Sequence, residues 1–536
     1  MKLFLIALIA MLTAATAASQ PKKENRELYE NYNKIGQTLV YIDSYYVDTS
    51  NIPRLTEKAI VHMLRQLDPH SSYLSAADVK ASNEQLEGNF EGIGIEFTIL
   101  DDTLTVAVPL AGGPSEAVGI MAGDRIIAVD SLPIAGIGLK NERVLKLLRG
   151  AKGTSVALTI VRKGNPTPLH FTVIRDKIPV HSLDALYEVQ PGMVYIRLGR
   201  FSVTSVDEIK DALKKIKRPP QSVILDLRGN SGGVLKTAVE LCDQFLDAGQ
   251  LIVYNEGEHW PKSMDVATGQ GMFRNGRLLV LIDEHSASAS EIVAGAVQDW
   301  DRGILIGRRS FGKGLVQQLL PLPDGSQLRL TVARYHTPTG RAIQRPYDAG
   351  NTDKYYADLY KRYSNGEIYH RDSIRFPDSL KYYTLVNRRE VYGGGGIMPD
   401  IFLPADTSFY SDYYFQILRA GLLSQFVMQR MDRERSTLLK RYKTFAAFDR
   451  RFSIDDALFD EFIAYVETRR IPRSEQGLAL SGQYLRTQLK ALIARALWDT
   501  SEYYEVINKQ LDPVFLKAVE VMTKWEEHAG ESGIRN

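Results

Sequence analysis

The chain has 536 residues, which at roughly 150 residues per domain indicates three or four domains. Hydrophobic residues make up 44% and charged residues 24% of the chain, which excludes a mostly disordered protein, a collagen-like fibre and a multi-span membrane protein. The formal net charge of +2 provides no global field that would recruit nucleic acid, and the single cysteine, Cys242, excludes an internal disulfide and cysteine-rich metal sites. We therefore expect no nucleic-acid partner, no cofactor and no metal.

The first residues have the pattern of a secretory signal peptide. Lys2 precedes the apolar run Leu3–Leu12, which is shorter than the roughly 20 residues needed to span a bilayer. Ala15 and Ala17 follow at the spacing of an A-x-A cleavage site. We predict a signal peptide over residues 1–17, an exported mature chain in the periplasm and no stable membrane span. The alternative is an uncleaved segment that keeps the protein at the inner membrane.

Residues 18–87 are predicted to be a helical region, because apolar side chains recur there at three- and four-residue steps. Leu67–Tyr73 interrupts this pattern and is interpreted as a turn-rich connector. His70 within it could be a ligand or a base, but a turn histidine without partners is more often structural.

Residues 88–178 change to short β runs separated by glycine, with a tight turn into a buried strand at Ala122–Asp130. This stretch resembles a PDZ domain of the bacterial type, in which a glycine loop binds a peptide's terminal carboxylate and the peptide joins the sheet as a strand. The loop would consist of Gly92, Ile93, Gly94 and Ile95. The alternative is a small β domain that uses those glycines only for turns.

Residues 179–405 alternate strand and helix signals, so we predict an α/β domain. The run Val223–Leu227 is almost wholly apolar, as expected for a strand covered on both faces, and leads into Arg228–Gly233 and a helix. Leu278–Ile282 repeats the pattern and leads into Asp283–Glu291 and a second helix. Serine and glycine are therefore concentrated at two strand–loop–helix corners.

Two serines compete as a nucleophile at these corners. Ser231, within Gly229–Gly233, resembles the serine loop of trypsin-like proteases, but a PDZ-like segment precedes it instead of the histidine, the acid and the double β-barrel. Ser288 lies between small residues at a helix start, where the N–H of Ala289 is at the positive end of the helix dipole. Ser288 is the stronger candidate. His285 is interpreted as a loop residue rather than its base.

A serine nucleophile needs a base, and Lys313 is a candidate because it lies between two glycines, directly after Phe311. An ordinary lysine has a pKa of about 10.4, so accepting a proton near neutral pH requires the pKa to fall by roughly three, which costs about 4 kcal/mol. Burial beneath the glycine backbone would supply that lowering. Taken locally, an ordinary loop lysine is the stronger interpretation.

The order of motifs reverses that balance. The motifs in chain order are Leu67–Tyr73, the PDZ-like unit, Asp226–Gly233, Ser286–Glu291, Phe311–Gly314, Tyr335–Arg341 and Gly396–Asp400. This series resembles the C-terminal processing peptidases, also called tail-specific proteases, over roughly residues 25–405. The resemblance implies a crotonase-like (ClpP/crotonase-type) α/β protease core over residues 179–405, with an inserted PDZ domain and flanking N- and C-terminal helical regions.

The resemblance also implies a Ser–Lys dyad, with Ser288 as the nucleophile and neutral Lys313 as the general base. Gln317, expected one helical turn beyond Lys313, would orient the amine. Glu291 would assist as a hydrogen-bonding acid near the serine.

The oxyanion hole implied by the resemblance would use the backbone N–H of Ala289 together with that of Gly232 or Gly233. The implied function is that of an exported serine endopeptidase, which cleaves proteins near accessible C-termini after PDZ recognition. The PDZ unit would either deliver substrate tails or gate the dyad. A non-catalytic PDZ-containing peptide-binding scaffold of the periplasm is the alternative.

Two segments depart from the resemblance. A tyrosine-rich insertion at residues 345–392 is longer than expected, and we favour surface decoration or an oligomer contact over a lid. Residues 406–536 form a further helical region whose apolar stripes are typical of a core or a dimer interface, which leaves a homo-oligomer through these helices open.

Overall fold

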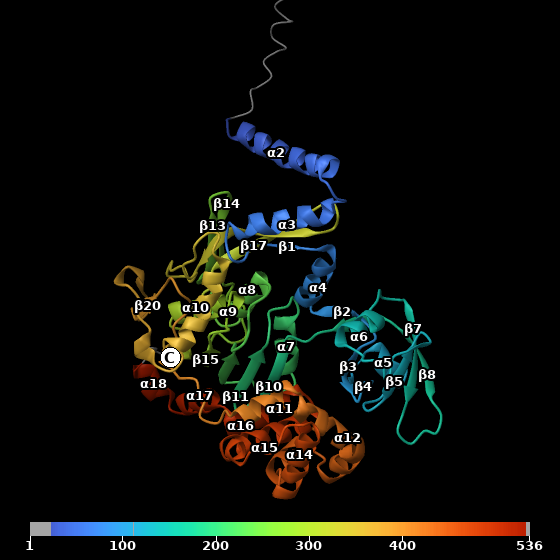
Figure 1. Ribbon diagram of the computed structural model, residues 1–536. Coiled ribbons are helices and arrows are strands. Elements are labelled where there is room, and N and C mark those ends of the chain that lie inside the picture. Colours follow the sequence, from blue (N-terminus) through green and yellow to red (C-terminus); the bar gives the residue numbers. More distant parts are fainter. Residues whose placement is uncertain (1–22, 111, 532–536) are drawn as a thin grey trace, which may run out of the picture. The chain divides into compact units, whose positions relative to one another are not determined.

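The computed structural model describes residues 23–110 and 112–531, labelled as in Figure 1. The predicted signal peptide, residues 1–17, lies outside them. The chain divides into two compact units, residues 1–67 and 68–536. The first unit contributes the helices α2 (Lys23–Tyr45) and α3 (Ile52–Arg65). Along the described ranges, every helix is too short or too polar to cross a membrane.

A six-stranded sheet forms the centre of the second unit. Its strands, in spatial order, are β10 (Leu183–Gln190), β11 (Met193–Leu198), β12 (Ser222–Asp226), β15 (Arg277–Ile282), β16 (Ile304–Gly307) and β21 (Ile401–Phe402). All neighbouring pairs are parallel except β10–β11. This sheet and its helices form the mixed α/β core that the alternating signals predicted.

Both faces of this sheet are covered, because successive side chains of each strand point to opposite faces. Val223 and Leu225 of β12 pack among α7 (Ser205–Leu213), α8 (Leu235–Asp243) and α9 (Ala289–Asp299). Ile224 of the same strand packs against α17 (Pro513–Thr523) and α18 (Trp525–Glu531). The last two described helices therefore belong to the core of the α/β domain.

A second sheet has the order β1 (Ser72–Leu74), β18 (Gln327–His336), β13 (Leu251–Gly257) and β14 (Trp260–Val266), with β17 (Leu315–Pro321) also paired to β18. The predicted connector Leu67–Tyr73 thus contains part of a strand, in which Ser72 pairs with Arg329 of β18. The short strand escaped prediction because its hydrogen-bond partners lie far away in the sequence.

The PDZ-like segment has its own sheet and its own core (Figure 1). Its strands are β3 (Ile95–Leu100), β4 (Thr103–Pro109), β5 (Arg125–Val129), β6 (Leu132–Pro133), β7 (Ser155–Val161) and β8 (Leu169–Ile174), and its helices are α5 (Pro114–Ala117) and α6 (Asn141–Leu148). The helix α4 (Ala76–Glu87) precedes it, and β2 (Asn89–Gly92) pairs with β9 (Asp176–Pro179) at its root.

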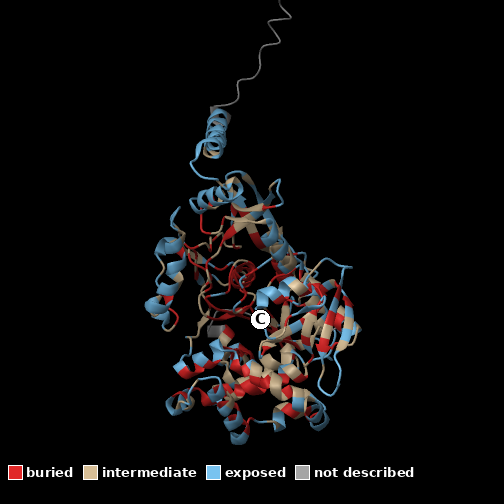
Figure 2. Cartoon of the chain, turned by 45° about the vertical axis from the view of Figure 1, so that its right-hand side comes forward, coloured by how far each residue is buried: buried red, intermediate tan, exposed pale blue. Residues whose placement is uncertain are grey.

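The tyrosine-rich insertion contains α10 (Thr352–Ser364), two short 3-10 helices, Arg371–Ser373 and Asp378–Leu380, and the hairpin β19 (Lys381–Tyr383) and β20 (Glu390–Tyr392). The C-terminal bundle consists of α11 (Asp412–Arg419), α12 (Leu422–Arg441), α13 (Phe445–Arg451), α14 (Asp456–Thr468), α15 (Glu475–Leu497) and α16 (Thr500–Leu511). This bundle encloses a separate hydrophobic core, and its outward surfaces are exposed (Figure 2).

The packing of α17 generates a stability prediction. Phe515 is 2% exposed and meets the ring of Tyr195 edge-on at a centroid distance of 5.4 Å. We expect Phe515→Ala to lower the free energy of unfolding by about 3–5 kcal/mol, because it removes a large buried ring from the sheet face. Leu516→Ala, on the exposed side of the same helix, is the matched control. Equal thermal midpoints for the two variants would contradict the assignment of α17 to the core.

Candidate active site

Ser288 occupies the turn between β15 and α9. It caps the helix with φ 55° and ψ −112°, a positive φ that is unusual for a residue other than glycine. The side chain is half-buried, whereas α9 itself is buried throughout. Within the described residues, no group accepts from the backbone N–H of Ala289, which lies in the first turn of the helix. The corner therefore presents a hydroxyl beside a donor at the positive end of a helix.

The side chain of Glu291 joins this corner to the loop that carries Lys313. One of its carboxylate oxygens accepts from the backbone N–H groups of Ser288 at 2.8 Å and Lys313 at 2.9 Å. The other oxygen accepts from the Ser310 hydroxyl at 2.5 Å and the Gly312 N–H at 2.7 Å. Burial raises the pKa of Glu291, and the four donors act in the opposite direction. Glu291 therefore positions the backbones of Ser288 and Lys313, and its carboxylate is fully engaged in doing so.

The glycine corner after β12 packs directly against Ser288. A Cβ on Gly232 would lie 2.8 Å from the Ser288 Cβ, so only glycine fits there. The N–H of Gly232 donates to the Asn230 side chain at 2.9 Å, while that of Gly233 has no acceptor among the described residues. Gly233 is exposed and Gly232 is buried. Of the two predicted alternatives, Gly233 thus has the N–H that is available to a ligand.

Among the described residues, no hydrogen bond joins Ser231 or His285 to Ser288 or Lys313. Ser231 is exposed on the glycine corner. His285 is exposed as well, and its ring nitrogen lies 3.9 Å from Glu284, so it remains a loop residue as predicted.

Lys313 lies on a loop whose surroundings favour a neutral amine. Burial, and then the charge of Arg329, lower the pKa of Lys313, while Glu291 and Asp68 raise it. The Tyr335 hydroxyl donates to the Lys313 carbonyl. Burial raises the pKa of this tyrosine well above its ordinary value, and a hydrogen bond with Ser288 acts in the opposite direction. Tyr335 thus contacts both predicted members of the dyad. Among the described residues no hydrogen bond joins the Ser288 hydroxyl to the Lys313 amine; such bonds commonly shorten only when substrate binds.

Gln317 does not lie on a helix, contrary to the sequence prediction. It lies on β17, at an irregularity in the pairing with β18. Its side-chain N–H donates to the Leu315 carbonyl at 3.2 Å and lies 3.5 Å from the Thr331 hydroxyl. The helical spacing was wrong because the glycines around Lys313 break the helix and the β18 partner imposes an extended chain.

The segment that begins at Asp68 lies in the region around Lys313 and Gln317. The sequence did not predict this placement. The Asp68 carboxylate accepts from the backbone N–H groups of His70 and Ser71 and from the Thr331 hydroxyl. Burial, followed by the charge of Lys313, lowers the pKa of His70 to about 4. His70 therefore lies close to the predicted base. The available signal was the place of Leu67–Tyr73 as the first motif of the ordered series.

The predicted peptide loop of the PDZ-like segment has a compact geometry. Gly92 pairs with Asp176, Ile93 is buried, and Gly94 has a φ of 74°, where a Cβ would lie 2.9 Å from the Ile178 side chain. Ile95 begins β3, which pairs only with β4 in its sheet, so the other edge of β3 has no partner strand in the described structure.

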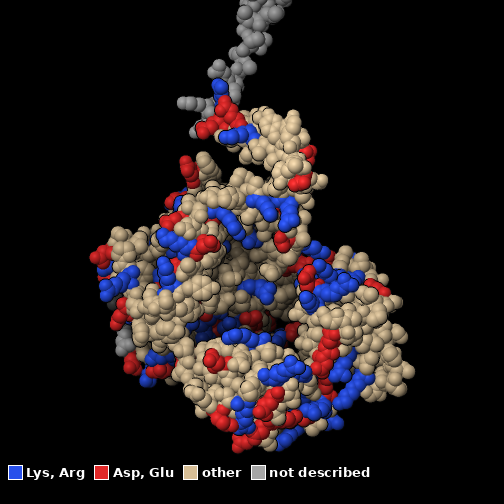
Figure 3. Space-filling view, viewed as in Figure 1, with Lys and Arg blue, Asp and Glu red and all other residues tan. Residues whose placement is uncertain are grey.

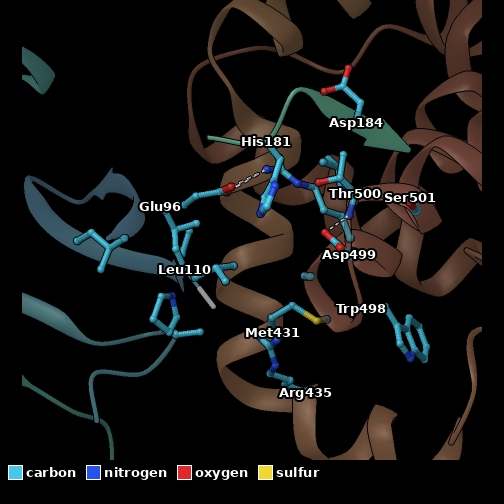
Figure 4. Close-up of a pocket in the computed structure, with 18 of the residues that line it drawn as sticks. Glu96, Leu110, His181, Asp184, Met431, Arg435, Trp498, Asp499, Thr500 and Ser501 are labelled. Atoms are coloured by element: carbon cyan, nitrogen blue, oxygen red, sulfur yellow. Dashed lines mark hydrogen bonds and ion pairs between the residues drawn. The ribbon is translucent and has the colours of Figure 1, made fainter. Parts of the chain in front are cut away.

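A cavity of about 1970 Å³ lies between the PDZ-like segment, β10 and the C-terminal bundle. Figure 4 shows Glu96 on its PDZ side and Met431, Arg435 and Trp498 on the side of the bundle, and Figure 3 shows the hollow at the surface. Ser288 and Lys313 do not line it. Two exposed ion pairs, Glu96–Arg495 at 2.9 Å and Asp101–Arg469 at 3.2 Å, join the PDZ-like segment to the bundle.

No three His, Cys, Asp or Glu side chains within the described ranges are arranged to hold a metal ion. The chemistry available at the site is that of a hydroxyl, a buried amine and free backbone N–H groups. Such a set suits acyl transfer, in which a nucleophile attacks a carbonyl and N–H donors stabilise the oxyanion.

Comparisons with known proteins agree with this chemistry. The peptidase family S41 matches residues 192–350, the PDZ domain family matches residues 92–173, and a family of unknown function matches residues 413–499. A carboxy-terminal-processing protease of Bartonella bacilliformis is 38% identical over 322 residues, which cover 59% of this chain and 73% of the relative. A carboxyl-terminal-processing protease of Picosynechococcus is 37% identical over 294 residues, covering 54% and 70%.

Among solved structures, a photosystem II D1 C-terminal processing protease is 28% identical and matches 57% of this chain and 89% of its own, with a TM-score of 0.33.

The engagement of Glu291 with four donors predicts the effect of removing its charge. We expect Glu291→Gln to cost roughly 2–3 kcal/mol of stability, because a carboxamide has a single acceptor oxygen and turns an N–H₂ group toward donors. Displacement of Ser288 and Lys313 should also lower peptide cleavage by roughly 100-fold. Thermal unfolding and kcat/KM would be compared with Glu240→Gln, a change of a partly exposed carboxylate on α8. Cleavage equal to that of the control would contradict the positioning role.

Proposed function

Because the chain belongs to the carboxy-terminal-processing proteases of peptidase family S41, a family of serine-type peptidases, we propose that Ser288 and Lys313 are its catalytic dyad. The observation that carries the proposal is the shared carboxylate of Glu291, which receives the backbone N–H groups of both residues. The lowered pKa of Lys313 supports its role as the base.

In the proposed reaction the neutral amine of Lys313 takes the hydroxyl proton as the oxygen of Ser288 attacks the scissile carbonyl. The resulting C–O bond gives a tetrahedral oxyanion, and Lys313 then returns the proton to the departing amine as the peptide C–N bond breaks. A water molecule, deprotonated by Lys313, hydrolyses the acyl-enzyme and restores the serine.

The oxyanion hole in this proposal consists of the N–H groups of Ala289 and Gly233. Both are without acceptors in the described structure, and both lie next to Ser288, the first along the chain and the second through the close packing of Gly232. Gly232 serves instead as the residue that allows that packing. Removing one donor of an oxyanion hole typically costs 10²–10³ in kcat.

Gln317 would orient the amine of Lys313 through its amide oxygen, since its amide nitrogen already donates to Leu315. Glu291 is assigned a positioning role in place of the predicted acid role near the serine, because all four of its hydrogen bonds hold the corner and the loop.

The substrates proposed are proteins with accessible C-termini. The PDZ domain would bind such a terminus as a strand along the open edge of β3, with its carboxylate at Gly92–Ile95. The ion pairs at Glu96 and Asp101 are exposed, and exposed pairs contribute little to stability, about 0–1 kcal/mol each. A PDZ domain held in this way can shift when a substrate tail binds.

We extend the proposal to two further properties of the chain. The apolar run and A-x-A pattern of residues 1–17 support export to the periplasm. The repeated corners on a parallel sheet support a crotonase-like arrangement of the core. Fractionation of cells that express the full chain would test export, with recovery in the cytoplasm as the contrary result.

Cleavage of an unstructured protein substrate tests the dyad. We expect Ser288→Ala and Lys313→Ala to lower cleavage at least about a thousandfold, because each removes a group that forms or breaks bonds. Ser231→Ala, on the exposed glycine corner, should retain most of the activity. Mass spectrometry would locate the cut sites. Equal cleavage by all variants would exclude the dyad, and an inactive wild-type protein would favour a peptide-binding scaffold.

Blocking the substrate terminus tests recognition by the PDZ domain. We expect a bulky polar tail fused after the substrate's terminal apolar residues to slow cleavage at least about tenfold, the equivalent of 1.4 kcal/mol of lost binding. The same tail at the substrate's N-terminus is the control. Initial rates well below KM would be compared, and equal rates for both fusions would contradict capture of the C-terminus at Gly92–Ile95.

A further inference from the structure

We propose that Tyr355 of the insertion and His70 of the Asp68 segment form a wall over the Lys313 side chain, which keeps water from its amine. Both are then positioning residues, since they act through the lysine and not on the substrate. The inference rests on the proposed role of Lys313 as the base. It assigns a catalytic purpose to the insertion, for which the sequence favoured decoration or an oligomer contact.

The contacts of Tyr355 place it against the Lys313 loop. Its side chain is 3% exposed, and its hydroxyl lies 3.0 Å from the ring nitrogen Nε2 of His70. Gln344 donates to the same hydroxyl at 3.3 Å and, through its amide oxygen, accepts from the N–H of Gly314 at 2.8 Å. The Arg345 guanidinium stacks 3.8 Å from the centre of the Tyr355 ring. The tyrosine is thus connected through one side chain to the residue directly after Lys313.

The same helix holds the residues that precede Lys313. Arg362, buried at 2% exposure, donates to the carbonyl of Ser310 at 2.7 Å and to that of Phe311 at 3.2 Å. Glu367, just beyond α10, forms a two-pronged ion pair with Arg309 at 2.6 and 2.7 Å. The insertion is therefore bonded directly to the residues before the lysine and, through Gln344, to the residue after it.

The other tyrosines of α10 show that the inward orientation of Tyr355 is specific. Tyr360 is 77% exposed, and Tyr356 is 41% exposed, with its hydroxyl donating to the Pro69 carbonyl at 3.3 Å. Tyr355 and Tyr356 together join the helix to Pro69 and His70. Two segments almost three hundred residues apart in the sequence therefore meet beside Lys313.

The charges around Lys313 define what the wall does. Arg329 on β18 disfavours the charged amine, Glu291 on α9 and Asp68 favour it, and burial outweighs these charges, so the pKa is lowered. His70 and Arg345 also face this region. Besides burial, the charges of Lys313 and Arg345 lower the pKa of His70, and the charge of Asp68 raises it. With its pKa at about 4, His70 stays neutral at working pH and adds no opposing charge. Removal of the wall would admit water and stabilise the protonated lysine.

The test is the pH dependence of kcat/KM for peptide cleavage by the full chain. We expect Tyr355→Ala to move the acidic limb of the profile to higher pH, because water would stabilise the charged amine. If the acidic limb moves up by about one pH unit, activity at pH 7.5 should fall about tenfold. Activity should largely recover at high pH. Tyr355→Phe keeps the ring and should keep the limb near that of the wild type. Tyr360→Ala, on the exposed face of the same helix, is the matched control.

Each outcome separates the inference from the proposed function. An unchanged limb in a folded Tyr355→Ala protein would overturn the wall while Lys313→Ala remains inactive. An active Lys313→Ala protein would instead overturn the dyad. If Tyr355→Ala does not fold, as judged by its melting curve, His70→Ala opens the wall from the other segment, and an unchanged limb there overturns the proposal. A uniform loss at every pH in Tyr355→Ala, without recovery, indicates a structural role only and also overturns it.

Discussion

The buried carboxylate of Glu291 is the interaction on which the site depends. Burial of a carboxylate is unfavourable unless hydrogen bonds replace its water, and here three backbone N–H groups and one hydroxyl do so. One of these donors is the N–H of Ser288, at the positive end of α9. The same bonds that compensate for burial fix Ser288 relative to Lys313. Stability and the geometry of the proposed dyad are therefore coupled through one residue.

The loop that carries Lys313 has little structure of its own and is held from two directions. Glu291 receives N–H groups of Gly312 and Lys313, and Arg362 donates to the carbonyls of Ser310 and Phe311. Since Glu291 binds backbone N–H groups and Arg362 binds backbone carbonyls, the loop is fixed without a regular helix or strand. Glycine on both sides of the lysine permits this close approach. The insertion is thus part of the support of the site.

The sequence predicted those features whose signals are local. The apolar run Val223–Leu227 predicted a strand covered on both faces, and the residues around Ser288 predicted the start of α9. Lys313 could not be chosen from its neighbours, because its lowered pKa comes from burial by distant segments. Gln317 was predicted to lie on a helix, but pairing with the distant strand β18 makes its segment a strand. Tyr355 carried no local signal that distinguished it from the other tyrosines of its helix.

The attachment of the PDZ domain lies close, along the backbone, to the glycine corner that packs against Ser288. At its root, the N–H of Val203 donates to the Leu86 carbonyl, and two residues earlier the backbone of Phe201 pairs with the glycine corner. The Phe201 carbonyl accepts from the N–H of Val234, and the Phe201 N–H donates to the carbonyl of Gly232. Both chain neighbours of Gly233 are therefore bonded to Phe201. Lys313 is fixed by segments outside the PDZ domain. In the proposed mechanism, a shift of the domain transmitted through Phe201 would act on the N–H of Gly233, the proposed oxyanion donor, and would change stabilisation of the transition state.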